Sequence, residues 1–223
     1  MTTSESRGPS CPHSASGREG TPAPATQLSR GAFFADFYVY PLAAAVFLAL
    51  PIAANPQRWI VTCAAAVTGL ALWTLLEYLL HRFVLHHVKW VKNQHDMHHH
   101  DAKALVGTPT WFSFLVFLVT LTLPVLLAST VEIASGLTAG VMLGYLWYVT
   151  VHYGIHHWKF RSSGYLGRLK SRHALHHHFD DLGNFGVTSG LWDFVFCTNL
   201  TRRDVADRVY GAGSPGLTPG DGW

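Results

Sequence analysis

Four apolar segments are the feature that most limits what this chain can fold into. One of them, 111–131, has no charged residue over 21 positions, which is long enough to cross a hydrocarbon layer of about 30 Å. The others lie at about 37–54, 59–80 and 137–156. Only 13% of the residues are charged, roughly half the usual fraction for a soluble protein. A chain of 223 residues is also too small to surround four such helices with polar partners. We therefore predict an all-α, multi-pass membrane protein with four transmembrane helices.

The positive charges indicate which ends of these helices share one side of the membrane. Of the 16 Lys and Arg residues, 15 lie near the N-terminus, within 81–110, or after residue 152. With four crossings these three regions fall on the same side, which the positive-inside rule makes cytoplasmic. We expect both termini and a helical, His-rich cap on that side. The residue usage favours a bacterial cytoplasmic membrane, with the endoplasmic reticulum as the alternative.

The ends of the chain differ in composition from the apolar middle. Residues 1–30 are rich in Ser, Thr, Gly and Pro and have no apolar run, so we predict a disordered tail without a secretory signal. We assign residues 31–200 to one membrane domain and residues 201–223 to a flexible, Gly/Pro-rich tail. The three cysteines are far apart, so neither a disulfide framework nor a thiolate metal site is indicated. The low content of charged residues argues against nucleic-acid binding.

Histidine is the unusual residue type in this sequence. Of the 15 histidines, 14 fall in two windows of seven. Each window begins at the cytoplasmic end of a predicted membrane helix and ends in H-x-x-H-H-H. We interpret the windows as an internal repeat, in which a helical hairpin is followed by a His-bearing segment. The two windows comprise His81, His86, His87, His95, His98, His99 and His100, and His152, His156, His157, His173, His176, His177 and His178.

The spacing within the windows is suited to binding metal ions. His152 and His156 are four positions apart and share one helix face. We expect the H-x-x-H-H triplets that begin at His95 and His173 to converge on one ion in the same way. Imidazole nitrogen binds Fe, Zn, Cu and Ni, and ten or more imidazoles predict two ions held close together. Protonated imidazole cannot bind a metal, so low pH should release the ions. Metal storage would not need motifs tied to helix ends, and a transporter would place its ligands near the bilayer midplane.

The order of these motifs resembles the fatty acid hydroxylase/sterol desaturase superfamily of membrane dimetal oxygenases. Four short strings resemble fatty acid 2-hydroxylases in particular: LEYLLHRF at 76–83, LGY at 143–145, GVTS at 186–189 and LWDF at 191–194. The resemblance covers about residues 35–200. It implies two iron ions, with zinc as an alternative in isolated protein, and ten ligands. The implied ligands are His81, His86, His95, His98, His99, His152, His156, His173, His176 and His177.

The same resemblance implies a reaction and its partners. The reaction would use O2 to hydroxylate an unactivated C–H bond of a lipid from the bilayer, expected to be a fatty acyl chain. A sterol or carotenoid hydroxylase or desaturase is the alternative, followed by a metal-handling membrane protein that is not an enzyme. Residues 1–30 are too short for the cytochrome b5 domain that many such enzymes carry. We therefore expect a separate electron donor, such as a cytochrome b5-like protein, a ferredoxin or a reductase.

Other residues are candidates for supporting the metal ligands or the substrate, and none is predicted to be catalytic beyond the metal centre. Metal-bound imidazole usually donates its second N–H to a carboxylate or carbonyl. Glu77 lies four positions before His81 on the same helix face, and an acid at membrane depth needs a partner. Asn184 is expected to reach the site through a water molecule. The remaining candidates are His87, His100, His157 and His178, the acids Asp96, Asp101, Asp180 and Asp181, and, for the substrate, Tyr145, Trp147 and Tyr148.

Overall fold

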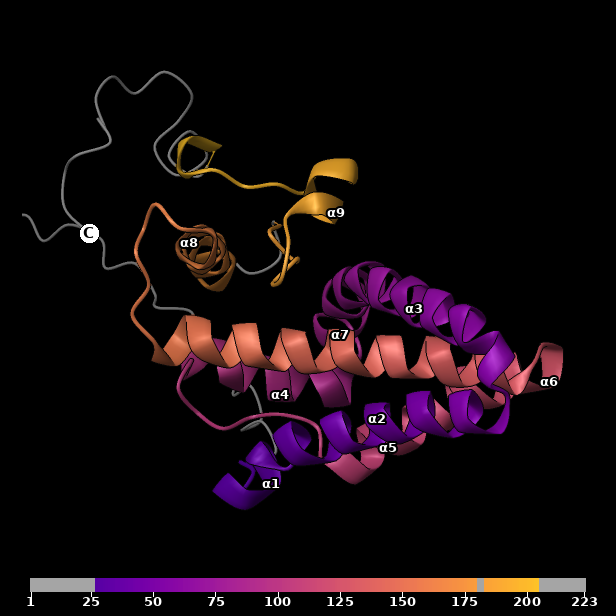
Figure 1. Cartoon of the computed structure of the whole chain (residues 1–223). Helices are drawn as coiled ribbons and strands as arrows, with labels where there is room; N and C mark the ends of the chain where they lie inside the picture. The colour runs from indigo at the N-terminus through magenta and orange to yellow at the C-terminus, as the bar shows by residue number, and fades with distance from the viewer. Residues whose placement is uncertain (1–26, 180–182, 205–223) are drawn as a thin grey trace, which may run out of the picture.

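The computed structural model describes residues 27–179 and 183–204, and every regular element in these ranges is helical (Figure 1). The predictions for residues 1–26 and 205–223, and for Asp180 and Asp181, lie outside the described residues. In chain order the elements are α1 (Arg30–Phe34), α2 (Asp36–Ala54), the 3-10 turn η1 (Pro56–Arg58), α3 (Trp59–Leu79), the π-helical η2 (Leu80–Leu85), α4 (Lys89–His100), α5 (Thr110–Phe117), the π-helical η3 (Leu118–Thr122), α6 (Leu123–Ala128), α7 (Val131–His157), α8 (Tyr165–His178) and α9 (Leu191–Val195).

Four continuous helical segments are long and apolar enough to cross a membrane. They comprise Arg30–Ala54, Pro56–Leu85, Thr110–Ala128 and Val131–His157. Large apolar side chains cover their outer surfaces; Leu127 is 80% exposed and Val67 is 69% exposed. Such surfaces are favourable against lipid, and helices satisfy their own backbone hydrogen bonds there. The predicted all-α fold with four membrane helices is confirmed.

The helix boundaries differ from the predicted segments at one hairpin. The third span ends at Ala128 rather than at residue 131, because the chain turns at Ser129 and Thr130 and α7 then begins at Val131. The fourth helix therefore starts at Val131 rather than at residue 137. Its first turn contains the buried Glu132, which accepts a hydrogen bond from Asn55 at 3.3 Å and lies 3.5 Å from Arg58. These partners allow Glu132 to lie inside the helix, whereas the hydropathy pattern predicts that the helix begins only after this acid.

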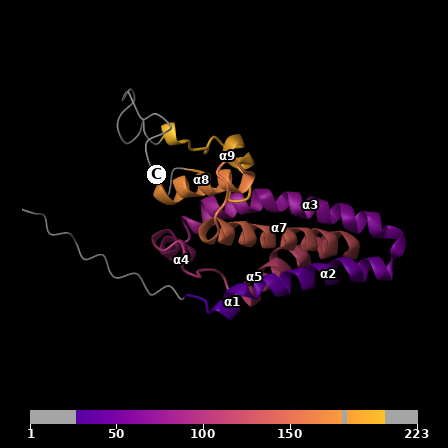
Figure 2. The same cartoon turned by 60° about the vertical axis from the view of Figure 1, so that its left-hand side comes forward.

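The close packing of α3 on α7 organises the bundle (Figures 1 and 2). Glycines on α7 lie directly against the α3 backbone. A Cβ atom at Gly140 would lie 1.9 Å from the carbonyl oxygen of Ala66, and one at Gly136 would lie 2.2 Å from that of Thr62. Small residues of this kind allow membrane helices to approach closely. Thr62 meets Gly136, Ala66 meets Gly140 and Trp73 meets Gly144, so the two helices run in the same direction.

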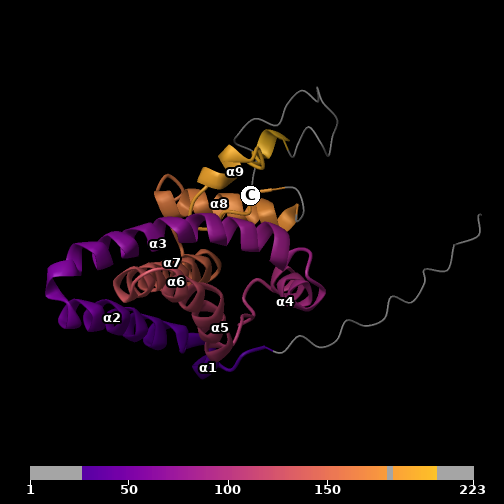
Figure 3. The same cartoon turned by 90° about the vertical axis from the view of Figure 1, so that its right-hand side faces the viewer.

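The His-bearing helices lie at the end of the bundle where α3 and α7 finish. Figures 2 and 3 show α4 and α8 at this end, opposite the turn that joins α2 to α3. A small apolar core fixes α8 on α7: Val151 and Ile155 of α7 pack with Leu169 of α8 and with Val187. This core holds α8 in the predicted helical, His-rich cap.

Candidate metal centre

Ten imidazoles lie in two groups of five at the cap end of the bundle. Within each group, one ring nitrogen of every histidine lies within 4.8 Å of those of the other four. The ten are the residues that the family resemblance implies as ligands. The first group contains His81, His86, His95, His99 and His176, and the second contains His98, His152, His156, His173 and His177.

Each H-x-x-H-H triplet contributes its middle histidine to a different group from its two outer ones. On α4, His95 and His99 belong to the first group, whereas His98 belongs to the second. On α8, His173 and His177 belong to the second group, and the intervening histidine, His176, belongs to the first. Adjacent residues on an α-helix point about 100° apart. The prediction that each H-x-x-H-H triplet converges on one ion is therefore wrong, and each triplet contributes to both groups.

A π-helical segment brings His81 and His86 together. Residues five positions apart on a regular α-helix point about 140° away from each other. The segment η2 (Leu80–Leu85) instead has the i to i+5 pattern of a π-helix. The ring centroids of His81 and His86 lie 5.3 Å apart with nearly parallel planes. The H-x4-H spacing thus fits a local change of helix type that places both rings in the first group.

The hydrogen bonding of the first group leaves nitrogen lone pairs that point toward one another. His81 Nδ1–H donates to the carbonyl oxygen of Phe185 at 2.6 Å, so the Nε2 atom of neutral His81 carries a lone pair. His176 Nδ1–H donates likewise to Gly183 at 3.0 Å, and its buried Nε2 has no hydrogen-bond partner among the described residues. His95 Nε2 faces three other imidazole nitrogens at 2.9–3.2 Å. One N–H cannot satisfy three such contacts, whereas a cation among the lone pairs can, so this group fits a metal ion.

The second group has the same character. His173 Nε2 lies 3.1 Å from His152 Nε2, 3.0 Å from His156 Nε2 and 3.0 Å from His177 Nε2. His98 Nε2 lies 3.1 Å from His156 Nε2. The buried Nδ1 atom of His173 has no hydrogen-bond partner within the described part of the chain. This group therefore also fits a cation bound by nitrogen.

The two groups are adjacent. The rings of His99 and His177 stack with their centroids 4.2 Å apart and their planes 8° apart. His99 belongs to the first group and His177 to the second. Ions bound at the two groups would therefore lie close together, as the sequence predicts for a dimetal centre.

Burial keeps four of the grouped histidines of α4 and α8 neutral at pH 7. Desolvation, with smaller contributions from neighbouring imidazoles, lowers the pKa of His98 to about 3 and that of His99 to about 2. Desolvation also lowers the pKa of His176 to about 3 and that of His177 to about 4, against hydrogen bonds to backbone carbonyls that raise both. Neutral imidazole is the form that binds a metal. The protein environment thus prepares these side chains for ligation.

Several predicted supporting residues lie away from the groups. Asp96 forms a salt bridge with Lys92 at 2.6 Å, and Asp101 accepts a hydrogen bond from the backbone of Lys103 at 3.0 Å. The Asp96 salt bridge stabilises α4, whereas Asp101 lies at the end of this helix and its negative charge also favours the protonated form of His98. Among the described histidines, four are exposed and belong to neither group, namely His87, His100, His157 and His178.

The side chains of Glu77 and Asn184 both form hydrogen bonds with the backbone. The Glu77 carboxylate accepts hydrogen bonds from the backbone N–H groups of Val187 and Thr188, each at 2.7 Å, and from the Thr188 hydroxyl at 2.6 Å. Asn184 donates to the Leu200 carbonyl and accepts from the Leu200 N–H, both at 3.0 Å. Its backbone φ of 58° lies in the left-handed region. Both residues hold the segment 183–188, which carries the carbonyls that bond to His81 and His176.

The aromatic residues proposed for substrate contact have three different surroundings. Tyr145 donates a hydrogen bond to Asp36 at 2.8 Å, and Tyr148 stacks on the ring of His152 with centroids 5.5 Å apart. Trp147 is 48% exposed on the outer surface of α7. Of the three, only Tyr148 is described in contact with a histidine of either group.

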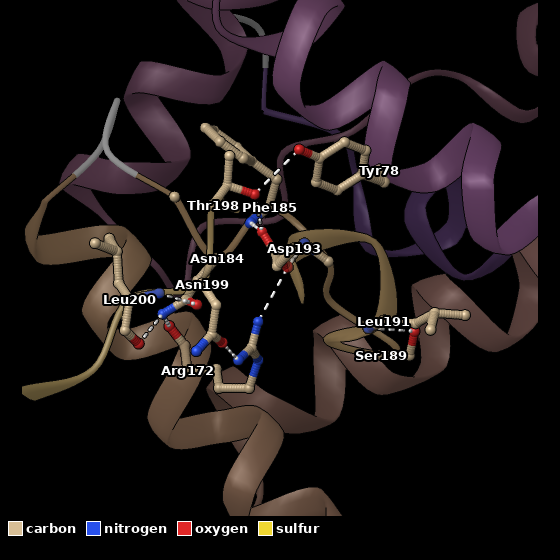
Figure 4. Close-up of polar contacts among 12 residues, drawn as sticks. Tyr78, Arg172, Asn184, Phe185, Ser189, Leu191, Asp193, Thr198, Asn199 and Leu200 are labelled. Carbon is tan, nitrogen blue, oxygen red and sulfur yellow. Dashed lines mark hydrogen bonds and ion pairs between the residues drawn. The ribbon is translucent and has the colours of Figure 1, made fainter. Parts of the chain in front are cut away.

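Sequence reasoning missed Asp193, the most completely bonded buried acid near the groups. Its carboxylate accepts hydrogen bonds from the backbone N–H groups of Phe185 and Gly186, each at 2.9 Å, and from the Thr198 hydroxyl at 2.8 Å (Figure 4). Arg172 lies 3.0 Å away. The only signal in the sequence was the string LWDF at 191–194, which contains this acid among apolar residues.

Comparisons with known proteins agree with this site. The fatty acid hydroxylase family model matches residues 66–198, which contain both groups. The chain is 37% identical over 150 residues to the fatty acid 2-hydroxylase of Rattus norvegicus, covering 61% of this chain and 40% of that protein. It is 38% identical over 150 residues to dihydroceramide fatty acyl 2-hydroxylase FAH1 of Arabidopsis thaliana, covering 61% of each.

A solved structure shares the fold. Full-length Scs7p, in which only the hydroxylase domain is visible, superposes with a TM-score of 0.66 and 27% sequence identity, covering 76% of this chain and 67% of that one. The match to the rat enzyme spans about two fifths of that protein's length. The family model, by contrast, matches more than half of the present chain. The chain therefore belongs to the fatty acid hydroxylase family.

Proposed function

We propose that the chain is an integral-membrane lipid hydroxylase that acts on a fatty acyl chain with O2 and electrons from a separate donor. The observation that carries this proposal is the gathering of ten buried or partly buried imidazoles into two adjacent groups at one end of four apolar helices. The relatives are named for hydroxylation of fatty acids and dihydroceramides, which supports a lipid C–H bond as the target. We place two iron ions at the groups, with zinc as a substitute in isolated protein.

Iron bound at the two groups would activate O2 and allow one of its oxygen atoms to be transferred to the lipid. In the overall reaction a C–H bond becomes C–OH. The second oxygen atom leaves as water. The donor supplies two electrons for this step, and solvent supplies two protons. A cytochrome b5-like protein, a ferredoxin or a reductase can fill this role. Because α3 and α7 end in the cap, an electron donor would approach from the cap side, which we assign to the cytoplasm.

The chain itself binds the ions and excludes water from them. The first group is held by η2 and the residue that follows it, by α4 and by α8, and the second group by α4, α7 and α8. His81, His173 and His176 are each no more than 2% exposed, so water is largely excluded from the nitrogen atoms. Tyr148 of α7 stacks on the ring of His152. We expect the acyl chain to reach the groups from the bilayer.

Lipid analysis of cells that express the chain with a redox partner tests this function. We would supply fatty acids, ceramides, sterols and carotenoids and compare the wild type with His176→Ala/His177→Ala. The expected product is a fatty acyl species heavier by one oxygen atom, present in the wild type and absent from the variant. The matched control is His87→Ala/His178→Ala, which removes two exposed imidazoles outside both groups and should keep the product.

The alternatives give different results in the same experiment. A modified sterol or carotenoid would replace the fatty acyl assignment, and a product lighter by two hydrogen atoms would indicate a desaturase. Unchanged lipids in a metal-loaded protein with a working donor would contradict the enzymatic proposal and favour metal handling.

A further inference from the structure

One short loop, 183–188, bonds to two histidines of the first group. Its Gly183 carbonyl accepts from His176 at 3.0 Å, and its Phe185 carbonyl accepts from His81 at 2.6 Å. These bonds fix which ring nitrogen of each imidazole carries hydrogen, and so direct the other nitrogen into the group. The position of the two carbonyls therefore determines the orientation of two of the five nitrogen donors.

The Phe185 side chain reinforces this contact. Its ring centroid lies 5.9 Å from that of His81, 5.5 Å from that of His86 and 5.6 Å from that of His176. Phe185 is 4% exposed. A shift of this residue would thus disturb three rings of the first group by packing and one by a lost hydrogen bond.

The loop backbone has a conformation that needs external support. Asn184 has a φ of 58°, and Gly183 has a φ of 153°. A Cβ atom at Gly183 would lie 2.0 Å from the Thr198 carbonyl oxygen, and one at Gly186 would lie 2.0 Å from that of Ser189. Backbone in sparsely populated regions persists only where the surroundings fix it.

Asp193 provides the central support (Figure 4). Its Oδ1 accepts from the Phe185 N–H and its Oδ2 from the Gly186 N–H, both at 2.9 Å. Thr198 and Arg172 also bond to it, and the residue is 0% exposed. A carboxylate bonded to several donors in a buried site fixes them more strongly than a neutral acceptor does.

We propose that Asp193 is a positioning residue for the first group, acting through the Gly183 and Phe185 carbonyls on His176 and His81. This inference rests on the proposed function, because it assumes that the groups bind metal ions. It predicts a larger effect on the ion of the first group, since the loop carbonyls bond to His81 and His176 and the described ring contacts of Phe185 with grouped histidines all involve the first group.

The experiment measures metal content and release rather than activity. Wild type and Asp193→Asn would be purified in detergent and loaded with iron(II), and the ions per chain would be counted by mass spectrometry. Release to a chelator would then be followed over time. We expect two ions in the wild type, and in Asp193→Asn one ion that leaves about 10-fold to 100-fold faster while the other is unchanged.

Double variants identify the affected group. In a His98→Ala background, where the first group keeps its five ligands, Asp193→Asn should accelerate release of the remaining ion. In a His176→Ala background, where the first group is already broken, Asp193→Asn should change little. The matched control is Glu132→Gln, which alters another buried carboxylate paired with an arginine, Arg58, at the opposite end of α7.

A milder variant covers the case in which Asp193→Asn does not fold. Asn184→Gly keeps a residue that tolerates positive φ and removes only the side-chain bonds, so it should give a smaller acceleration of the same phase. Equal loss of both ions in the milder variant, or wild-type release in Asp193→Asn, would overturn the positioning role and leave the proposed function standing. A wild type that binds no metal would overturn both.

Discussion

The two histidine groups contain the same number of imidazoles but are built in different ways. In the second group, regular helices direct four of the five rings: His152 and His156 on α7, and His173 and His177 on α8, are pairs four positions apart. The first group needs a π-helical segment to align His81 with His86, and a loop to orient His81 and His176. Helix geometry alone nearly defines one group, whereas the other depends on irregular backbone held by buried acids.

We expect the largest effect from replacing His98 or His176, the two histidines that bind in the group of the other sequence window. His98→Ala should remove the ion of the second group and His176→Ala that of the first, although each residue lies in the sequence window of the other group. We expect lipid product to fall by at least about 100-fold in either variant, since removing a ligand exceeds the usual effect of removing its support. Metal counting should give one ion per chain.

The exposed His100 provides the control for this test. It lies on α4 two positions from His98 and outside both groups, so His100→Ala should keep both ions and full activity. Loss of both ions in His98→Ala would show that the groups do not bind independently.

Glu77→Gln should weaken metal binding at the first group more than at the second, by a smaller factor than removal of a ligand. The change removes a charge that holds the Val187 and Thr188 N–H groups, and so loosens the loop that orients the first group. We expect about a 10-fold loss of affinity for one ion and little change for the other. Competition with a chelator measures both affinities. A uniform loss at the two sites would contradict the assignment of this loop to the first group.

Gly140→Leu should affect both groups equally. A side chain there meets the Ala66 carbonyl oxygen on α3, so the two helices must move apart, and overpacking of this kind usually lowers stability by about 1–3 kcal/mol. Thermal unfolding in detergent measures the loss. Gly31→Ala is the control, because nothing lies within 4 Å of a Cβ atom at Gly31. An effect on one ion alone would contradict a shared scaffold.

Acid should destabilise the metal-free protein through both groups. Burial lowers the pKa of His176 to about 3 and that of His177 to about 4, whereas an unfolded histidine titrates near 6.5. Between these values the unfolded chain binds more protons, so stability falls as the pH falls from about 6.5 toward 4. Unfolding temperatures measured from pH 8 to pH 4.5 should decline below pH 6.5. A constant temperature over that range would contradict the neutral state of these side chains.

The smallest effect should come from Asp96→Asn. Its salt bridge with Lys92 is partly exposed and joins positions four apart on α4, and such pairs contribute about 0.3–0.5 kcal/mol. We expect both ions to be retained and the unfolding temperature to change little. A selective loss of one ion would instead assign Asp96 a role in orienting its neighbour His95.

The sequence alone determined the all-α membrane class, and its family resemblance implied the ten histidines that the structure gathers. Hydropathy along 111–131 and the i, i+4 spacing of His152 and His156 are local properties, so they can be read without knowing which helices meet. The same reasoning started α7 too late, because the partners of Glu132 lie on another hairpin.

Only the tertiary structure decided how the histidines divide between the groups and what orients them. His98 and His176 join histidines of the other sequence window because α4 and α8 face each other across the cap. The spacing of residues along one helix does not specify this arrangement. Asp193 likewise acts on His81 through a loop whose contacts join residues far apart in the chain. These assignments depend on the packing of separate segments, and a local sequence pattern does not encode which segments will pack together.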